Sequence, residues 1–290
     1  MTTQSSILVT GASGQLGRLT IAALLKHVSR QQIYALVRSD EAAAGLASFG
    51  VNVRIGDYRR PESLDAALSG IERLLLISSN DLGNRSAQHA NVIDAARRQR
   101  VGMIAYTSLL HADKSELGIA GEHRETEEAL EASGVPYVLL RNGWYTENYA
   151  AGIPAARAHN ALAGSAGEGR IASAARADYA EAAANILASD NFESGRIYEL
   201  AGDESYTLSE FAQELATQTH EEIVYANLPE DEFKAMLLGA GLPAPLAELL
   251  ADSDACAAHG ALFDDSRTLS KLLNRPTTSW KATISAALAV

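Results

Sequence analysis

Residues 7–17 read ILVTGASGQLG, and this stretch combines three local signals. The β-favouring run from Ile7 to Val9 predicts a short buried strand. Gly11, Gly14 and Gly17 follow at intervals of three residues, and the apolar residues between 16 and 25 recur at helical spacing. The stretch therefore predicts a strand, a tight turn and the start of a helix.

A turn of this kind favours an anionic ligand. Gly11 can adopt backbone angles closed to other residues, Gly14 lets the chain approach a pyrophosphate, and Gly17 lets the helix lie close to the strand. The free N–H groups at the positive end of the helix dipole then point toward phosphate oxygens. A plain β-to-α turn is the alternative, and the sequence contains no GxxxxGK[ST] motif of the phosphoryl-transfer type. The residues expected to bind a dinucleotide here are Gly11, Ser13, Gly14, Gln15, Leu16 and Gly17.

Composition narrows the class of protein. A chain of 290 residues with 47% hydrophobic content can bury a large core. The net charge of −12 argues against nucleic acid as a partner, because phosphate neutralisation needs a basic surface. Residues 151–290 carry most of the imbalance, with 9 basic against 20 acidic residues. Ordinary solvated acidic surface explains this as well as any binding role does.

Metal, disulfide and membrane signals are missing from the sequence. Cys256 is the only cysteine, and the seven histidines show no ligand spacing, so we expect no disulfide and no metal. No basic and apolar leader precedes Ile7, and no apolar run approaches the length of a membrane span. We expect a cytoplasmic protein without membrane contact. The sequence leaves open whether it is a monomer or a homodimer.

Strand-like and helix-like segments alternate along the first half of the chain. Such alternation predicts an α/β fold, a Rossmann-type doubly wound parallel sheet with ligands at the carboxyl ends of its strands. Beyond it, an alanine-rich helix, two short strands and a capping box at Thr207 and Glu210 predict a smaller C-terminal α+β substrate lobe. We assign residues 1–150 to the dinucleotide-binding domain and 151–290 to the lobe, with a soft boundary. The expected strands after the first are 33–37, 51–55, 74–77, 103–107, 137–140, 197–200 and 223–226, the helix is 177–189, and a loop that could cover the pocket is 239–245.

Arg38 ends the second expected strand, where an NAD-binding protein usually carries an acidic residue. An arginine there can pair with a 2′-phosphate, which favours NADPH. Asp40 and Glu41 follow at once and would repel that phosphate, so NADH stays open as a cofactor.

Polar residues also follow the next two strands. Asp57 and Tyr58 could bracket an adenine ring, and the segment Ser78, Ser79 and Asn80 could pass the ribose and pyrophosphate of the cofactor. Turn formation explains these residue types equally well.

The chemistry expected at the fifth strand is incomplete. Ser108 follows that strand, where a hydroxyl is well placed to bind a carbonyl oxygen. An alcohol dehydrogenase also needs a tyrosine with a lysine four residues on, whose charge lowers the pKa of the phenol. None of the ten tyrosines has lysine at that spacing. Tyr137 with Arg141 is the nearest imitation, but it lies in an expected strand, where the two side chains do not share a helical face.

Several longer motifs carry a family resemblance. The segments TGASGQLG, ALVR, LLLISSN, AYTSLLHAD, EHRETEEALEASGVPY, LLRNGWYTENY and LFDDSRTLSKLLNRPTTS extend over essentially the whole chain. The chain resembles the NmrA-like, atypical branch of the short-chain dehydrogenase/reductases, and within it the bacterial NADPH:quinone oxidoreductases of the second type. Relatives often open the helix after the fifth strand with Lys-x-x-x-Glu-x-x-Leu, and this chain has His123, Glu127 and Leu130 there, with Ile119 at the place of a catalytic tyrosine.

The resemblance implies a cofactor site without the usual proton relay. A quinone suits such a site, because hydride transfer to it gives a conjugated, aromatic hydroquinone anion that needs positioning more than acid catalysis. His123 could deliver a proton or hold the nicotinamide ribose, or be merely an exposed helix histidine. Asn142 and Gly143 are expected at the nicotinamide, and Leu109, Trp144 and Tyr145 at the substrate. The resemblance also implies that relatives carry a lysine shortly after the arginine, which residues 39–44 lack.

The function expected is NADPH-dependent reduction of a quinone. One alternative is a regulatory protein that senses NADP(H) without turnover. Another is a reductase of other planar conjugated acceptors, such as azo or triphenylmethane dyes.

Overall fold

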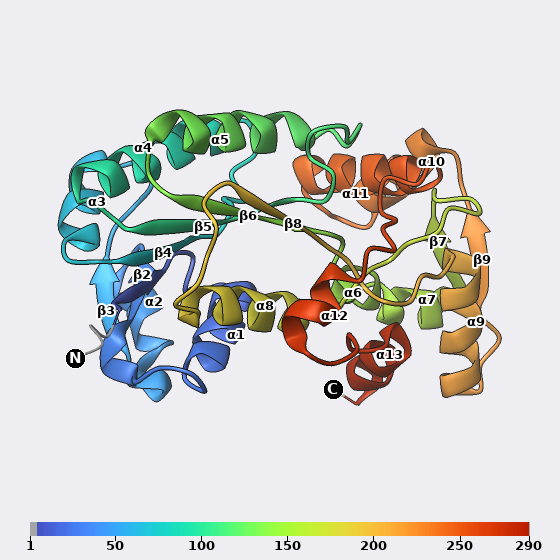
Figure 1. Ribbon diagram of the computed structural model, residues 1–290. Helices are drawn as coiled ribbons and strands as arrows, with labels where there is room; N and C mark the ends of the chain where they lie inside the picture. Colours follow the sequence, from blue (N-terminus) through green and yellow to red (C-terminus); the bar gives the residue numbers. More distant parts are fainter. Residues whose placement is uncertain (1–4, 290) are drawn as a thin grey trace. The chain divides into compact units, whose positions relative to one another are not determined.

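A computed structural model describes residues 5–289 of the chain (Figure 1). The chain divides into two compact units and crosses between them several times. Among the described residues, the first unit comprises 5–112, Gly121–Asn142 and Arg176–Tyr198, and the second comprises Asp113–Ala120, Gly143–Ala175 and 199–289. Each unit therefore draws on segments that are distant in the sequence.

The first unit is built on a sheet with the strand order β3-β2-β1-β4-β5-β6-β8. Neighbouring strands from β3 to β6 are parallel, and β1 pairs with β2 on one side and β4 on the other. The order of the strands reverses on either side of β1, which is where ligands bind in open parallel sheets. The strands are β1 (Ile7–Val9), β2 (Ile33–Val37), β3 (Asn52–Ile55), β4 (Arg73–Leu76), β5 (Met103–Leu109), β6 (Tyr137–Asn142) and β8 (Arg196–Leu200).

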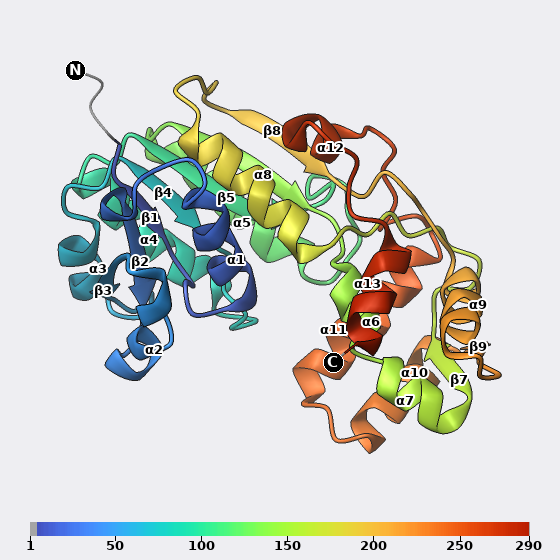
Figure 2. The same ribbon diagram turned by 90° about the horizontal axis from the view of Figure 1, so that it is seen from below.

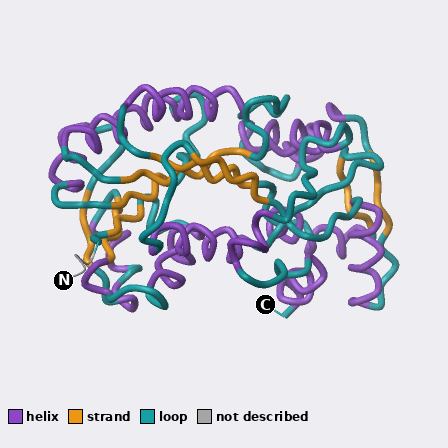
Figure 3. Tube along the Cα trace, in the orientation of Figure 1, coloured by secondary structure: helices purple, strands orange, loops and turns teal. Residues whose placement is uncertain are grey.

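Helices cover both faces of this sheet (Figures 1 and 3). Helices α3, α4 and α5 lie on one face, and α1 and α8 lie on the other, where they pack side by side (Figure 2). The central strands β1 and β5 are fully buried, as expected of parallel strands covered on both sides. The helices of this unit are α1 (Gln15–Leu24), α2 (Asp40–Ala44), α3 (Pro61–Leu68), α4 (Arg85–Arg98), α5 (Ala120–Ser133) and α8 (Arg176–Ala188).

Gly17 sets how closely α1 approaches β1. A Cβ at this position would lie 2.5 Å from the carbonyl oxygen of Gly11 and 2.7 Å from the Cα of Ala12. Real Cβ atoms do not approach backbone atoms this closely, so any other residue would push the helix away. The close packing that the sequence predicts for Gly17 is confirmed.

Thr10 joins the ends of β1 and β4. Its buried side-chain hydroxyl donates to the carbonyl of Leu75 at 3.0 Å and accepts the N–H of Ile77 at 2.9 Å. The backbone N–H of Thr10 donates to the same carbonyl of Leu75 at 3.0 Å. This side chain continues the pairing of the two strands beyond the last residue of β4.

The predicted fold class is confirmed, and most of the expected strands agree with the structure. Strand β2 has the predicted bounds, β3 and β4 each begin within one residue of prediction, and β5 and β6 each run two residues further. Strand β7 (Ala161–Gly164) was not predicted. Its sequence ALAG has no alternation of apolar and polar residues and little β propensity, so the parallel pairing with β9 decides its conformation.

The second unit holds the two-stranded sheet of β7 and β9 (Val224–Asn227) with several helices. The predicted capping box is confirmed: Thr207 accepts from the N–H of Glu210 at 3.1 Å, and the Glu210 carboxylate accepts from the N–H of Thr207 at 2.8 Å. The predicted loop 239–245 is shorter in the structure, because only residues 240–243 lie between α10 and α11. The helices are α6 (Thr146–Ala150), α7 (Ile153–His159), α9 (Leu208–Thr219), α10 (Glu230–Gly239), α11 (Ala244–Ala257), α12 (Thr268–Leu273) and α13 (Trp280–Leu288).

The second unit contains packed aromatic rings and one buried carboxylate. Tyr206 and Trp280 pack with ring centroids 4.6 Å apart. On α11, Asp254 accepts from the Tyr149 hydroxyl at 2.9 Å and from the backbone N–H of Ser165, just after β7, at 3.0 Å. Burial raises the pKa of Asp254 to about 6, although these two hydrogen bonds act in the opposite direction. None of the helices within residues 5–289 has the length and apolar composition to span a bilayer.

Replacing Thr10 by valine keeps the shape of the side chain but removes the acceptor of the Ile77 N–H. We expect the free energy of unfolding to fall by about 1–3 kcal/mol, the usual cost of leaving a buried polar group without a partner. Urea unfolding measures it. Thr20→Val is the matched control, since the Thr20 hydroxyl only adds a bond of 2.9 Å to the Leu16 carbonyl, which keeps its helical partner. Equal losses in the two variants would contradict this account of Thr10.

Asp254→Asn should change how stability depends on pH. The pKa of Asp254 is higher in the folded chain than the value of about 3.9 in an unfolded one, so the folded state binds the proton more tightly between pH 4 and 6. Ionisation then lowers stability as the pH rises through this range, by up to about 3 kcal/mol. The uncharged variant should gain stability over the wild type at pH 7 but much less at pH 4.5, in urea unfolding at both pH values. Asp252→Asn, on the same helix, is the control, and a pH-independent difference for Asp254→Asn would count against a buried charged carboxylate.

Candidate functional site

A cavity opens in the first unit at the carboxyl ends of β1, β2, β3 and β4. The segments that line it are those that follow each strand, so four separate parts of the chain meet there. Nine of the residues predicted from the sequence line this cavity: Gly11, Ser13, Gly14, Arg38, Asp57, Tyr58, Ser78, Ser79 and Asn80. The others that line it are Leu36, Val37, Gly56, Arg59, Ile77, Asp81 and Gln88.

The glycine turn forms one wall of the cavity. Gly11 has a φ of 56°, in the left-handed region that glycine adopts without strain, and its carbonyl accepts from the N–H of Gly14 at 2.9 Å. Gly14 is the N-cap of α1, so the first N–H groups of this ten-residue helix have no acceptor within the helix. Gln15, Leu16 and Gly17 form that first turn without lining the cavity themselves, and the Gln15 side chain accepts a hydrogen bond from Arg176 of α8.

Arg38 is an exposed side chain at the end of β2. Among residues 5–289, no hydrogen bond or ion pair engages its guanidinium. Asp40 and Glu41 lie in the first turn of α2, where carboxylates are favoured by the helix dipole, and they do not line the cavity. The repulsion that the sequence suggested therefore comes from residues outside the cavity wall.

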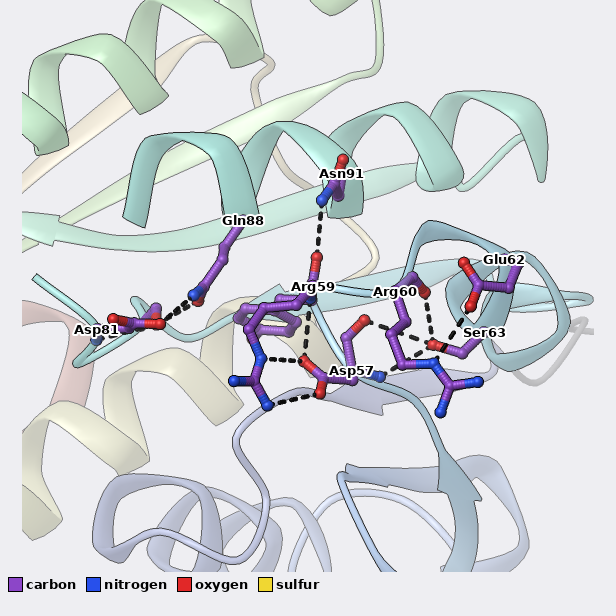
Figure 4. A network of polar contacts seen from close by, with 10 residues as sticks. Asp57, Arg59, Arg60, Glu62, Ser63, Asp81, Gln88 and Asn91 are labelled. Carbon is purple, nitrogen blue, oxygen red and sulfur yellow. Dashed lines mark hydrogen bonds and ion pairs between the residues drawn. The ribbon is translucent and has the colours of Figure 1, made fainter. Parts of the chain in front are cut away.

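The segment after β3 brings a carboxylate and a second guanidinium to the cavity. The Asp57 carboxylate accepts from the Nε of Arg59 at 3.3 Å and from its Nη2 at 3.0 Å (Figure 4). These hydrogen bonds hold the pKa of Asp57 below its usual range. The Tyr58 hydroxyl donates to the Ile77 carbonyl at 3.1 Å, and its ring packs against the hydrophobic core.

The segment after β4 is fixed by side chains of α4. Its backbone N–H at Ser79 donates to the Nε2 of His89 at 2.9 Å, and the Ser79 carbonyl accepts from the Nε of Arg85 at 2.7 Å. Gln88 accepts from the Ser79 hydroxyl at 2.6 Å and donates to Asp81 at 2.6 Å. Side chains of α4 therefore hold this part of the cavity wall in one conformation.

His89 continues these bonds into the core. Because its Nε2 accepts from a backbone N–H, its proton is on Nδ1, which lies 2.9 Å from the Thr126 hydroxyl. The Thr126 hydroxyl in turn donates to the carbonyl of Glu122 at 2.8 Å. Burial, together with the charge of Arg85, lowers the pKa of His89 to about 3, so this histidine is neutral at physiological pH.

His123 is buried in the structure. Its side chain is 4% exposed, and its Nδ1 lies 2.7 Å from the hydroxyl of the buried Tyr106 on β5. Burial and the charge of Arg85 hold its pKa well below the usual range. The exposed helix histidine considered from the sequence is wrong, because the polar residues around position 123 conceal the face of α5 that packs on the sheet. His123 does not line the cavity.

Ser108 is engaged in a buried ion-pair cluster. Its hydroxyl donates to the Glu127 carboxylate, which also accepts from the Nε of Arg141 at 3.0 Å and from its Nη2 at 2.7 Å. Both charged side chains are at most 10% exposed. Glu127 of the family pattern therefore joins α5 to β5 and β6, and it fixes the hydroxyl that was expected to meet a carbonyl group.

The end of β6 carries an unused acceptor. Asn142 is 6% exposed, and its side-chain oxygen has no hydrogen-bond partner among the residues that the structure describes. It pairs in register with Leu109, the last residue of β5, which is 7% exposed. A buried acceptor without a partner costs free energy, which makes Asn142 a candidate contact for a ligand.

The three residues after Asn142 belong to the second unit. The N–H of Gly143 donates to the carbonyl of Leu200 at 2.7 Å. Trp144 is 8% exposed and packs beside Tyr149, with ring centroids 6.3 Å apart. Tyr145 is half-buried and precedes α6.

Sequence reasoning missed three contributors to the site: Arg18, Arg59 and His89. Arg18 donates to the Ser13 carbonyl at 2.9 Å and to the Gly45 carbonyl at 2.6 Å, and so braces the glycine turn. Arg59 directly follows Asp57 and Tyr58, which the sequence suggested as adenine contacts. A cation at that position could therefore have been predicted as a part of the site. His89 gave no such signal, because a lone histidine within a helix has many roles.

A dinucleotide fits the residues present. The turn leaves no room for a Cβ at Gly17, and the first amides of α1 have no acceptor within the helix. Among residues 5–289, the Arg38 guanidinium has no hydrogen-bond or ion-pair partner, and the side-chain oxygen of Asn142 has no hydrogen-bond partner. Among the described residues, no three His, Cys, Asp or Glu side chains gather closely enough to hold a metal ion.

Comparisons with known proteins agree with this geometry. A family profile described as NAD(P)H-binding matches residues 11–190. Quinone oxidoreductase 2 of Escherichia coli is 53% identical over 279 residues, which cover 96% of this chain and 97% of that protein. The crystal structure of the NADPH-dependent quinone oxidoreductase QOR2 from Escherichia coli in complex with NADPH superimposes with a TM-score of 0.94 at 52% identity, covering 97% of this chain and 99% of that one.

Two further relatives extend the comparison. The triphenylmethane reductase of Citrobacter sp., complexed with NADP(H), has a TM-score of 0.93 at 38% identity and covers 97% of this chain and 100% of its own. The NmrA-like family domain-containing oxidoreductase flvB of Aspergillus flavus is 30% identical over 244 residues, 78% of this chain and 75% of that protein. The chain belongs to the NAD(P)H-binding, NmrA-like family that includes quinone oxidoreductase 2 of Escherichia coli.

Proposed function

We propose that this protein is an NADPH-dependent quinone oxidoreductase. The observation that carries the proposal is the 53% identity to quinone oxidoreductase 2 along nearly the whole length of both chains. The cavity at the carboxyl ends of β1 to β4, with its glycine turn and Arg38, supports the cofactor part of the proposal.

Different residues of the first unit bind different parts of NADPH in this proposal. The free amides at the start of α1 bind the pyrophosphate, and Arg38 pairs with the 2′-phosphate. Asn142, with its unpaired side-chain oxygen, accepts a hydrogen bond from the nicotinamide end. The segment Ser78 to Asn80, braced by α4, borders the middle of the cofactor.

Bound NADPH supplies the hydride for the reaction. A quinone that accepts it becomes a hydroquinone anion, whose charge is delocalised, so the site needs to position the acceptor more than to protonate it. The first unit has a single lysine, Lys26, just beyond the end of α1. This composition suits an acceptor that does not require a tyrosine and lysine relay.

In this proposal His123 is a positioning residue that acts through its contact with Tyr106. A histidine whose pKa is held low by burial is neutral at pH 7 and is not a source of an imidazolium proton. Its contact with Tyr106 fixes the packing of α5 on β5. Leu109, Trp144 and Tyr145 remain the residues predicted from the sequence to contact the acceptor.

A second candidate substrate class is planar dyes. It is favoured by the 38% identity to the Citrobacter triphenylmethane reductase over its full length. A protein that senses NADP(H) without turnover would share the same cofactor site. Loss of nicotinamide absorbance with a panel of soluble quinones and triphenylmethane dyes, with NADPH and NADH in parallel, separates the three. Fastest turnover with quinones supports the proposal, fastest turnover with dyes supports the second candidate, and tight binding without turnover on any acceptor supports the sensor.

Location and assembly accompany this proposal. A cytoplasmic protein is consistent with the single cysteine, Cys256, which is free in the structure. Sedimentation at several concentrations would decide between a monomer and a homodimer.

Arg38→Ala should weaken the binding of NADPH more than the binding of NADH. Removal of a charge-assisted pair with the 2′-phosphate costs about 1.5–3 kcal/mol, so we expect the KM for NADPH to rise about 10- to 100-fold and that for NADH to change about twofold or less. Steady-state kinetics with both cofactors measures the ratio. A similar rise for both would rule out a contact specific to the 2′-phosphate.

His123→Ala should slow the reaction only modestly. A residue that positions others typically changes kcat about tenfold or less, whereas a general acid contributes about 10²- to 10⁴-fold. Tyr106→Phe, which removes the partner hydroxyl, should have a similar effect, and the pH profile of kcat should keep its shape in both variants. A drop of several thousandfold for His123→Ala alone would identify it as a proton donor.

A further inference from the structure

Arg59 is a second cation on the wall that carries Arg38. It follows Asp57 and Tyr58 after β3, and its side chain is 62% exposed. Its backbone N–H donates to the Asp57 carboxylate at 2.9 Å, in addition to the two hydrogen bonds from its guanidinium (Figure 4). The guanidinium is therefore held at the cavity instead of ranging freely in solvent.

Asp57 occupies only part of this guanidinium. Of the five N–H donors of an arginine, Asp57 takes two, which leaves three for another acceptor. No other residue within 5–289 accepts from the Arg59 side chain. A guanidinium that is already held by one carboxylate and still has free donors can bind an anion with little further loss of side-chain entropy.

The charges on the cavity wall show why a second arginine matters. The charged residues that line the cavity are Arg38, Asp57, Arg59 and Asp81. Arg38 and Arg59 both contribute to lowering the pKa of Asp57 and of Asp81, so the two guanidiniums act on the same carboxylates. With Arg59 the wall is neutral, and without it Arg38 would face two carboxylates. A wall with net negative charge would repel a phosphate dianion.

We propose that Arg59, held in position by Asp57, is a second determinant of binding to the 2′-phosphate of NADPH. This inference rests on the proposed function, since it concerns the cofactor of that reaction. It adds a residue from the segment after β3 to a recognition site otherwise formed by the end of β2.

Direct binding tests the assignment without turnover. We would titrate the wild-type protein and Arg59→Ala with NADP⁺, NAD⁺, 2′,5′-ADP and 5′-ADP by calorimetry. The Kd for NADP⁺ and for 2′,5′-ADP should rise about tenfold in the variant, and the Kd for NAD⁺ and 5′-ADP about twofold or less. Arg59→Lys keeps the charge but loses the two-point geometry of the guanidinium. Its Kd for NADP⁺ and for 2′,5′-ADP should therefore lie between those of the wild type and Arg59→Ala.

Arg60→Ala is the matched control. Arg60 is the next residue, is equally exposed, pairs with Glu62 at 3.2 Å and does not line the cavity (Figure 4). Its removal takes away the same charge and should leave the preference for NADP⁺ over NAD⁺ unchanged. An equal loss of preference in both variants would overturn the inference and point to the general surface charge.

The remaining outcomes separate this inference from the proposed function. If Arg59→Ala weakens the binding of NADP⁺ and of NAD⁺ equally, the inference is refuted, and the Arg59 side chain is instead assigned a contact with the adenine ring. Binding of neither dinucleotide by the wild-type protein would instead refute the proposed function. A shift confined to the two ligands that carry the 2′-phosphate supports Arg59.

Discussion

The contact between Gly17 of α1 and the backbone of the glycine turn constrains the whole first unit. There is no space for a Cβ at this point, so only a glycine lets α1 approach the turn this closely. This close approach sets the position of the first turn of α1, which begins after Gly14 at the cavity, and α1 also packs beside α8. Geometry that a single methyl group would disturb thus underlies both the conformation of the glycine turn and the packing of α1 on the sheet.

A second constraint is that the buried polar side chains behind the cavity wall need hydrogen-bond partners. His89, Thr126 and Arg85 link the segment after β4 to α4 and α5, and Glu127 links Ser108 to Arg141. These side chains are buried or nearly so, and buried polar groups hold a single arrangement only when their partners are present. The wall of the cavity is therefore preorganised, and the free energy of ordering it is spent in folding and not in binding.

The sequence predicted the fold more completely than the site. Alternating strands and helices, the glycine turn and Arg38 are local patterns, and each appears in the structure where it was expected. The pairing of β7 with β9 and the burial of His123 depend on distant segments, which local spacing cannot report. His123 is the clearest case: its neighbours in the sequence are polar, and only the docking of α5 on β5 reveals its partner Tyr106.

The bond from the Ser79 N–H to His89 has a consequence for acidification. One ring nitrogen accepts from the backbone and the other faces Thr126, and the pKa of about 3 lies far below that of a free histidine. The segment after β4 is thus fixed by a neutral tautomer of His89 and not by a charge. A fall in pH that protonates ordinary surface histidines would leave this hydrogen bond in place.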